Sequence, residues 1–201
     1  MRIFAVVAAL GAGSALLADT PQERLREAIE VFQEIMGTPD KGIPQDLLDR
    51  AHCAVIIPNM KKAAFGIGGQ YGRGFAICRQ GTGWGWGAPA AVRMEGGSFG
   101  FQIGASSTDL VMLVMNERGM KKLLESKFTL GADASATAGP VGRSASAQTD
   151  AQMSAEILAW SRSQGVFAGI ALSGATLRND LDENKELYGR ELHNREVLMT
   201  G

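Results

Sequence analysis

Residues 99–115, FGFQIGASSTDLVMLVM, contain two strand patterns in succession. Up to Ala105, apolar side chains alternate with glycine or glutamine, the period of two expected for a strand with one buried face. The last six residues are continuously apolar, which predicts a strand buried on both faces. Such a strand needs covering layers on both sides, so this stretch predicts a fold built on a β-sheet.

Apolar and glycine-rich runs on either side of this stretch predict more strands. They are expected at 53–57, 63–71, 74–79, 128–130, 157–162, 166–172 and 175–178. Pro58 closes the first of these runs, because proline cannot donate to a strand ladder. The small residues at 132–147 are expected to form strands with close backbone contacts. The 26 glycines fit tight turns and close approaches of the backbone.

Helical signals lie at both ends of the chain and once in the middle. Thr20, Pro21 and Glu23 form a capping box ahead of an amphipathic helix that Gly37 ends. The expected apolar face of this helix consists of Leu25, Ala28, Ile29, Phe32 and Ile35 or Met36. Its polar face is mostly acidic, which favours packing on the core over lying on an anionic membrane.

Shorter helices are predicted at 44–51 and at 116–126, the second with Asn116 as its cap. A polar helix is predicted from about Asp180 to the end of the chain. The fold class is therefore a single α+β domain, with an antiparallel or mixed glycine-rich sheet, an N-terminal amphipathic helix, a short middle helix and a C-terminal helix. A chain of 201 residues is long enough for one well-buried domain.

The first 18 residues are predicted to be a signal peptide. Arg2 precedes an apolar run that ends before Asp19, with cleavage expected after Ala18 or, alternatively, after Ala15. An uncleaved anchor is the other interpretation. Residues 19–201 would then form a periplasmic or secreted domain. In an oxidising compartment Cys53 and Cys78 would form one disulfide, and two buried thiols are the alternative.

Three patterns resemble catalytic or binding motifs but lack the context that these need. Residues 96–100 match G-x-S-x-G, yet they continue into a strand and not into a helix. Residues 83–88 match G-x-G-x-x-A, with a proline directly after them. Asp180, Asp182, Asn184 and Glu191 have the spacing of a calcium loop, but lysine stands where the loop needs glycine, and the acids fit the first turn of a helix. The sequence therefore predicts no enzyme, cofactor or metal site.

Charge is unevenly distributed along a nearly neutral chain. Residues 54–130 carry nine basic and four acidic side chains, whereas 19–53 carry four and eight, and 131–201 carry six and nine. A basic middle could form a patch for anionic lipid, or its cations could pair with the acidic flanks.

The chain resembles the SYLF-domain family over nearly all of residues 51–189. The resemblance rests on "AHCAVIIPNMKKAAFGIGGQYGRGFAICR" at 51–79, on "GGSFGFQIGASSTDLVMLVMN" and "KFTLGADAS" in the middle, and on "SRSQGVFAGIALSGATLRND" near the end. It implies a non-enzymatic lipid-binding module, with phosphoinositide binding in eukaryotic members and actin binding in a fungal branch. For an exported member it implies an anionic phospholipid or membrane surface as partner, and no nucleic acid.

Basic and tryptophan residues are the expected lipid contacts. They are Lys61, Lys62, Arg73, Trp84, Trp86, Lys121, Lys122 and Lys127. Several exposed bases near an anionic surface act together, and indole rings favour headgroup depth. Alternatively, the tryptophans cap an edge of the sheet, and the domain is a structural or protein-interaction module of the envelope.

Overall fold

The computed structural model describes residues 19–38, 42–81, 85–142, 154–163 and 165–200, with the backbone alone at 64–67 and 98–104. Its helices are α1 (Pro21–Met36), α2 (Gln45–Arg50), α3 (Glu117–Leu123), α5 (Leu181–Tyr188) and α6 (Asn194–Thr200). Its strands are β1 (Cys53–Cys78), β2 (Ala90–Val114), β3 (Lys127–Thr129), β4 (Ala136–Ala138), β5 (Ile157–Ser163), β6 (Val166–Gly169) and β7 (Ala175–Asn179).

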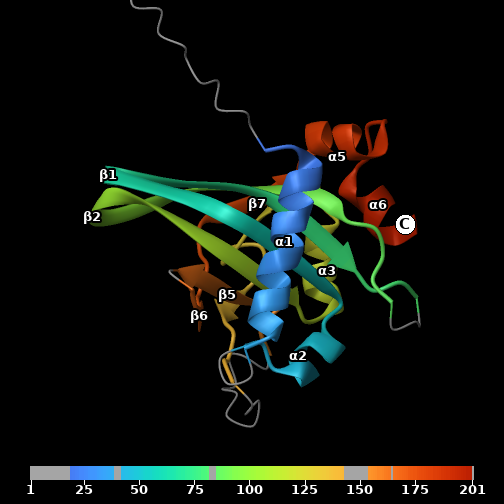
Figure 1. The fold of residues 1–201 in the computed structure, drawn as a ribbon, viewed down its shortest axis with the longest axis horizontal. Helices are drawn as coiled ribbons and strands as arrows, with labels where there is room; N and C mark the ends of the chain where they lie inside the picture. The colour runs from blue at the N-terminus through green and yellow to red at the C-terminus, as the bar shows by residue number, and fades with distance from the viewer. Residues whose placement is uncertain (1–18, 39–41, 82–84, 143–153, 164, 201) are drawn as a thin grey trace, which may run out of the picture.

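The two longest strands form one antiparallel ribbon that dominates the fold (Figure 1). It runs from the pair Ala76 and Ala90, beside the connecting turn, to the pair Cys53 and Val114. Its register shifts twice, and the first shift follows Ile57. There β1 carries Pro58, which has no N–H to donate, so a bulge lets the strand continue beyond it.

The ribbon folds back on itself, because residues on either side of about residue 65 in β1 lie together. A Cβ added to Gly74 would lie 2.0 Å from the carbonyl oxygen of Ile56, and one added to Gly72 would lie 2.6 Å from the Ile57 side chain. The two halves of β1 therefore touch, and only glycine leaves room for this contact. Figure 1 shows the bend at the left end of the ribbon.

Each half of the ribbon carries its own set of neighbouring strands. The last residues of β2 pair with β5, which in turn pairs with β4 and β6, and the first residues of β2 pair with β7, which pairs with β3. The β4–β5 pair is parallel and the others are antiparallel, so the sheet is mixed. This confirms the predicted α+β class.

Core residues occupy both faces of the curled sheet. Val55, Met94, Leu110 and Met112 belong to one buried cluster, and Ile56, Val111, Leu113 and Trp160 belong to a second cluster beneath α1. Residues 110–114 are buried on both faces, as the continuous apolar run predicts. In Figure 1 α1 crosses in front of the ribbon, and α5 and α6 lie at the other end of the molecule from the bend.

Strand lengths differ from the sequence prediction in several places. The sequence predicts separate strands at 53–57, 63–71 and 74–79, but the structure joins them into β1, because a bulge carries the strand past Pro58 and the pairing continues without a break through Gly72 and Arg73. The stretch 166–172 forms a strand only as far as Gly169. Of the small residues at 132–147, only Ala136–Ala138 form a strand, and 143–147 lie outside the described residues.

The helices begin where their caps predict. Thr20 and Glu23 form the expected capping box, and Asn116 caps α3. The buried face of α1 is rotated from the prediction, because Val31 is buried whereas Ile29 is 49% exposed. The C-terminal region contains two helices and not one, since Gly189 adopts a left-handed conformation that ends α5. No helix among the described residues is long and apolar enough to cross a membrane.

Candidate functional site

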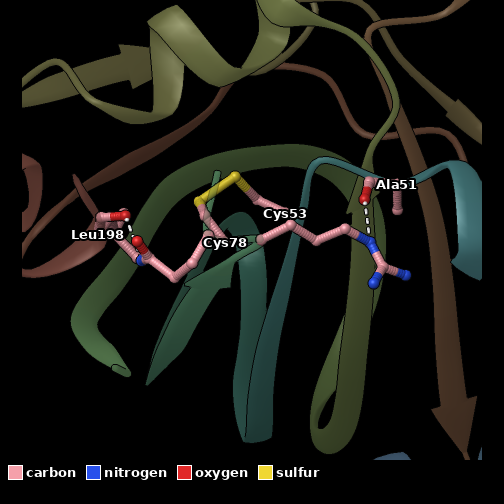
Figure 2. The surroundings of a disulfide bond; sticks show 6 residues. Ala51, Cys53, Cys78 and Leu198 are labelled. Carbon is pink, nitrogen blue, oxygen red and sulfur yellow. Dashed lines mark hydrogen bonds between the residues drawn. A yellow bond between two sulfur atoms is a disulfide. The ribbon is translucent and has the colours of Figure 1, made fainter. Parts of the chain in front are cut away.

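The two ends of β1 are joined by a disulfide between Cys53 and Cys78 (Figure 2). Both cysteines are buried. Next to them Arg79 donates from Nε to the carbonyl oxygen of Ala51 at 3.1 Å and from Nη2 to that of Leu48 at 2.9 Å. The guanidinium therefore donates to carbonyl oxygens at the C-terminal end of α2, where a helix supplies too few N–H donors of its own. This corner of the molecule ties a helix to the folded-back strand.

Trp86 lies at the same corner and takes part in packing. The Arg79 guanidinium stands 4.5 Å from the centre of its indole ring, within the range of a cation–π contact. Trp86 is half-buried against the cluster beneath α1. The structure thus favours the alternative in which it caps an edge of the sheet. Trp84, the other predicted tryptophan, lies outside the described residues.

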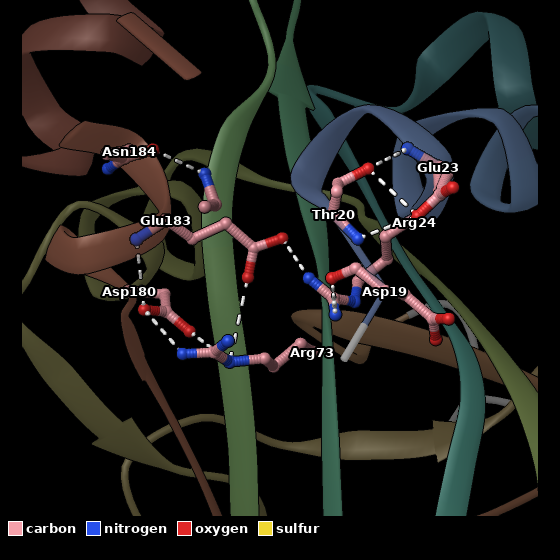
Figure 3. A network of polar contacts seen from close by, with 9 residues as sticks. Asp19, Thr20, Glu23, Arg24, Arg73, Asp180, Glu183 and Asn184 are labelled. Atoms are coloured by element: carbon pink, nitrogen blue, oxygen red, sulfur yellow. Dashed lines mark hydrogen bonds and ion pairs between the residues drawn. The ribbon is translucent and has the colours of Figure 1, made fainter. Parts of the chain in front are cut away.

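Arg73 belongs to an ion-pair network and not to an open basic surface (Figure 3). Its Nε lies 2.8 Å from Oδ2 of Asp180 and 3.6 Å from Oε2 of Glu183. Arg24 of α1 pairs with the other oxygen of Glu183 and donates to the carbonyl oxygen of Asp19 at 3.0 Å. Two arginines from distant parts of the chain therefore neutralise two buried acids of the α5 N-terminus.

Burial sets the electrostatics of this network. It raises the pKa of the Glu183 carboxyl above its ordinary value, and the Arg24 guanidinium opposes that shift. Burial also acts to lower the pKa of Arg73, but Asp180 and its other neighbours outweigh this and raise it. Asp180 itself caps α5 by accepting a hydrogen bond from the Glu183 N–H. The network joins α1, β1 and α5, and both of its arginines already pair with carboxylates.

Lys61 and Lys62 lie on the part of the ribbon that approaches the bend. Their register partners on β2 are Ser107 and Ser106. Lys61 is exposed, and its Nζ lies 3.5 Å from the Ser107 hydroxyl oxygen, while Lys62 is half-buried. Within the described residues neither amine forms an ion pair.

Lys121, Lys122 and Lys127 form a second basic group around α3 and β3. Lys121 and Lys127 are exposed and make no ion pair within the described parts of the chain, whereas Lys122 pairs with Glu125 at 3.0 Å. At about 3.3 Å per residue, Ser107 lies roughly 23 Å along β2 from Val114, which precedes the turn into α3. The basic middle of the sequence therefore folds into two separate groups and not into one patch.

The patterns set aside on sequence grounds have structural roles. Residues 96–100 lie within β2, without the strand-to-helix turn of a nucleophile elbow. Asp180 caps α5 and Asp182 lies in its first turn, which confirms the helical interpretation of the calcium-like spacing. The described residues contain no group of three His, Cys, Asp or Glu side chains that could hold a metal ion.

An apolar groove lies between α1 and β1. It has a volume of about 370 Å³, and Ile29, Phe32, Ile56 and Phe75 are among its lining residues. Among the described residues that line it, Gln33 is the polar side chain and none is charged, so the groove suits an apolar group better than a charged headgroup.

The sequence analysis did not predict the contacts between charged residues that are far apart in the chain. Arg24 and Glu183 are 159 residues apart, and the opposing strands place Arg93 and Arg178 side by side. Only the register of the sheet brings these residues together, and no local pattern carries that information.

Comparison with known proteins finds relatives whose printed names describe binding. A family model described as "Ysc84: Las17-binding protein actin regulator" matches residues 95–201. "LAS seventeen-binding protein 3" of Saccharomyces cerevisiae is 36% identical over 153 residues, which is 75% of this chain and 33% of that protein. The names of these proteins describe binding or regulation and not catalysis.

Vertebrate relatives match over a similar stretch. "SH3 domain-containing YSC84-like protein 1" of Xenopus laevis is 31% identical over 83% of this chain, and the human protein of that name is 29% identical over 87%. The chain spans about a third to a half of the length of these relatives. Together with the family match over half of the chain, this similarity confirms the resemblance seen in the sequence: the chain belongs to the Ysc84, or SYLF-domain, family.

Proposed function

We propose that this chain is a non-enzymatic module of the cell envelope that binds the surface of anionic phospholipid membranes. The observation that carries the proposal is the contrast between the lysines and the arginines. Arg24, Arg73 and Arg162 pair with carboxylates, whereas Lys61 and Lys62 face two serines on an exposed ribbon. Unpaired cations on a protruding element are available to an anionic surface.

The ribbon suits this role by its shape. Lys61 and Lys62 precede the bend in β1, which lies at one end of the molecule (Figure 1). Each lysine near an anionic surface contributes about 1 kcal/mol, so two together strengthen binding by roughly thirty-fold. The acidic helix α1 packs on the core beside β1.

Vesicle co-sedimentation tests the proposal. The full chain, and in parallel the chain beginning at Asp19, are mixed with vesicles of phosphatidylcholine alone or with phosphatidylglycerol added. Binding is expected only to the anionic vesicles and is expected to weaken with salt, because ions screen exposed charges beyond about 8 Å at physiological ionic strength.

The double variant Lys61→Gln, Lys62→Gln should bind about thirty-fold more weakly to the anionic vesicles. The control is Lys185→Gln, which removes an exposed lysine from α5. Equal losses in the variant and the control would show general electrostatic attraction and would contradict a role for the ribbon.

A protein partner is the second candidate, favoured by the printed names of the relatives. Actin is a candidate partner for this chain by analogy with its family alone. Failure to bind any vesicle, together with co-sedimentation with purified actin filaments, would favour this alternative.

A further inference from the structure

A row of four basic residues crosses the sheet outside the surface just proposed. Register pairing places Arg73 of β1 opposite Arg93 of β2, Arg93 opposite Arg178 of β7, and Arg178 opposite Lys127 of β3. Residues directly opposite one another point to the same face of a sheet, and like charges in that position destabilise it. An arrangement of this kind calls for negative charge nearby.

The protein supplies that negative charge to part of the row only. Asp180 and Glu183 neutralise Arg73, and Glu95 bridges Arg93 and Arg178 at 3.1 and 3.3 Å. Lys127, at the end of the row, pairs with no carboxylate within the described residues. The positive charge is therefore least compensated where β3 meets β7.

A cleft of about 270 Å³ opens at this end of the row. Arg93, Lys127 and Arg178 line it together with Ser126 and with His193, which follows α5. Asp182 is the acid among the lining residues. Three cations against Asp182 and the bridging Glu95 leave an excess of positive charge, and the Ser126 hydroxyl adds a donor of hydrogen bonds.

We propose that this cleft binds a phosphate group, carried by a small soluble molecule or by a lipid headgroup. Guanidinium groups match the oxygens of phosphate in pairs, and a neighbouring lysine adds a point charge. The cleft is smaller than the 300–1,000 Å³ typical of sites for whole drug-sized ligands, so it takes a compact group or the head of a longer molecule. The proposal stands on other residues than the ribbon and holds whether or not Lys61 and Lys62 bind membranes.

Thermal unfolding of the full chain with inorganic phosphate, at constant ionic strength with chloride as the reference anion, tests the cleft. A ligand that binds the folded state raises the midpoint as its concentration rises. Phosphate is expected to raise it, and glycerol phosphate is expected to do the same. In Arg178→Gln, and separately in Lys127→Gln, the phosphate concentration needed for the same shift should rise tenfold or more.

Lys185→Gln is the matched control, because it removes an exposed cation from α5 outside the cleft. Both cleft residues are at the surface, and the Arg178 side chain is 40% exposed, so these variants should unfold within a few degrees of the wild type in chloride. A phosphate response in Arg178→Gln and Lys127→Gln within twofold of the control would overturn the proposal.

Vesicles distinguish the two sources of phosphate. Phosphatidic acid presents a phosphate monoester, and it is compared with phosphatidylglycerol at equal surface charge. If the ligand is a headgroup, Arg178→Gln weakens binding to phosphatidic acid at least tenfold, whatever the result for the double lysine variant. If the ligand is soluble, Arg178→Gln loses the phosphate response and leaves vesicle binding unchanged. If Arg178→Gln keeps both the phosphate response and its full binding to phosphatidic acid, the proposal is contradicted.

Discussion

At the scale of single residues, the molecule separates its arginines from its lysines. Arg24 and Arg73 hold the buried acids of α5, and Arg162 pairs with Asp109 at 2.6 Å and also with Glu34. Arginine suits such positions because its planar fork bonds carboxylates in fixed geometry, whereas lysine is a flexible, strongly hydrated point charge. Arg24, Arg73 and Arg162 therefore stabilise the fold, whereas Lys61, Lys121 and Lys127 are exposed and form no ion pair within the described residues.

Arg24→Gln is expected to lower the free energy of unfolding by about 2 kcal/mol at neutral pH, the size of one charge-assisted hydrogen bond. The loss should shrink as the pH falls. Burial raises the pKa of Glu183 in the folded state, so stability linked to this group is fully present below the ordinary carboxyl pKa and declines as the pH rises through the folded-state value. Without Arg24 that decline is steeper, because the ionised Glu183 has lost a partner.

Urea unfolding at a series of pH values measures this effect. Arg26→Gln is the control, since Arg26 is exposed on the same helix. A loss in Arg24→Gln that stays constant from acidic to neutral pH would show that packing, and not the Glu183 charge, explains the effect.

At the scale of elements, the fold depends on where β1 can touch itself. The added Cβ at Gly74 would meet the Ile56 carbonyl oxygen and the Ile57 backbone, and neither is the end of a flexible side chain. A similar contact exists between Gly139 and the Trp160 indole, 2.1 Å from an added Cβ. These glycines are required by close packing of neighbouring strands, and their backbone conformation alone would not demand them.

Gly74→Ala is expected to reduce the free energy of unfolding by about 3 kcal/mol, because backbone atoms must move apart to admit one methyl group. Gly69→Ala provides the comparison on the same strand, since an added Cβ there has no neighbour closer than 4.0 Å. Urea unfolding of the two variants gives both values. A Gly69→Ala variant as unstable as Gly74→Ala would contradict the role of the fold-back contact.

Sequence patterns identify most elements but not their continuity or partners. The caps at Thr20 and Asn116 predict where two helices begin, because a cap depends only on residues about three positions apart in the sequence. Pro58 predicts the end of a strand, but β1 continues through it with a bulge. The count of charges along the chain left two interpretations open, a basic patch or cations paired with the acidic flanks, and it could not show that Arg73 meets Asp180. Such errors arise wherever the deciding contact is distant in sequence.

At the scale of the whole molecule, the disulfide closes the loop formed by the folded-back strand. The separation between Cys53 and Cys78 is 25 residues. Closing a loop of this length lowers the entropy of the unfolded chain and stabilises the fold by about 3.5 kcal/mol. Strand pairing, two core clusters and the Arg24–Glu183 contact also hold the fold together, so it is expected to survive removal of the bond at reduced stability.

The double variant Cys53→Ser, Cys78→Ser is therefore expected to unfold at lower urea concentration while keeping the circular dichroism of the wild type. Reducing agent should destabilise the wild type by a similar amount and leave the double variant unchanged. A wild type whose unfolding curve is the same with and without reductant would contradict a stabilising bond.

The ribbon also implies an order in which the chain acquires its shape. Ala76 meets Ala90 only fourteen residues later, whereas Cys53 meets Val114 sixty-one residues later. Because closing short loops is faster and costs less entropy, pairing is expected to start beside the turn and to proceed from there, pair by pair, toward the far end of the ribbon. The end of β1 that carries Cys53 is then the last to pair with β2. The two thiols would therefore be oxidised late, after the strands of the ribbon have paired in register.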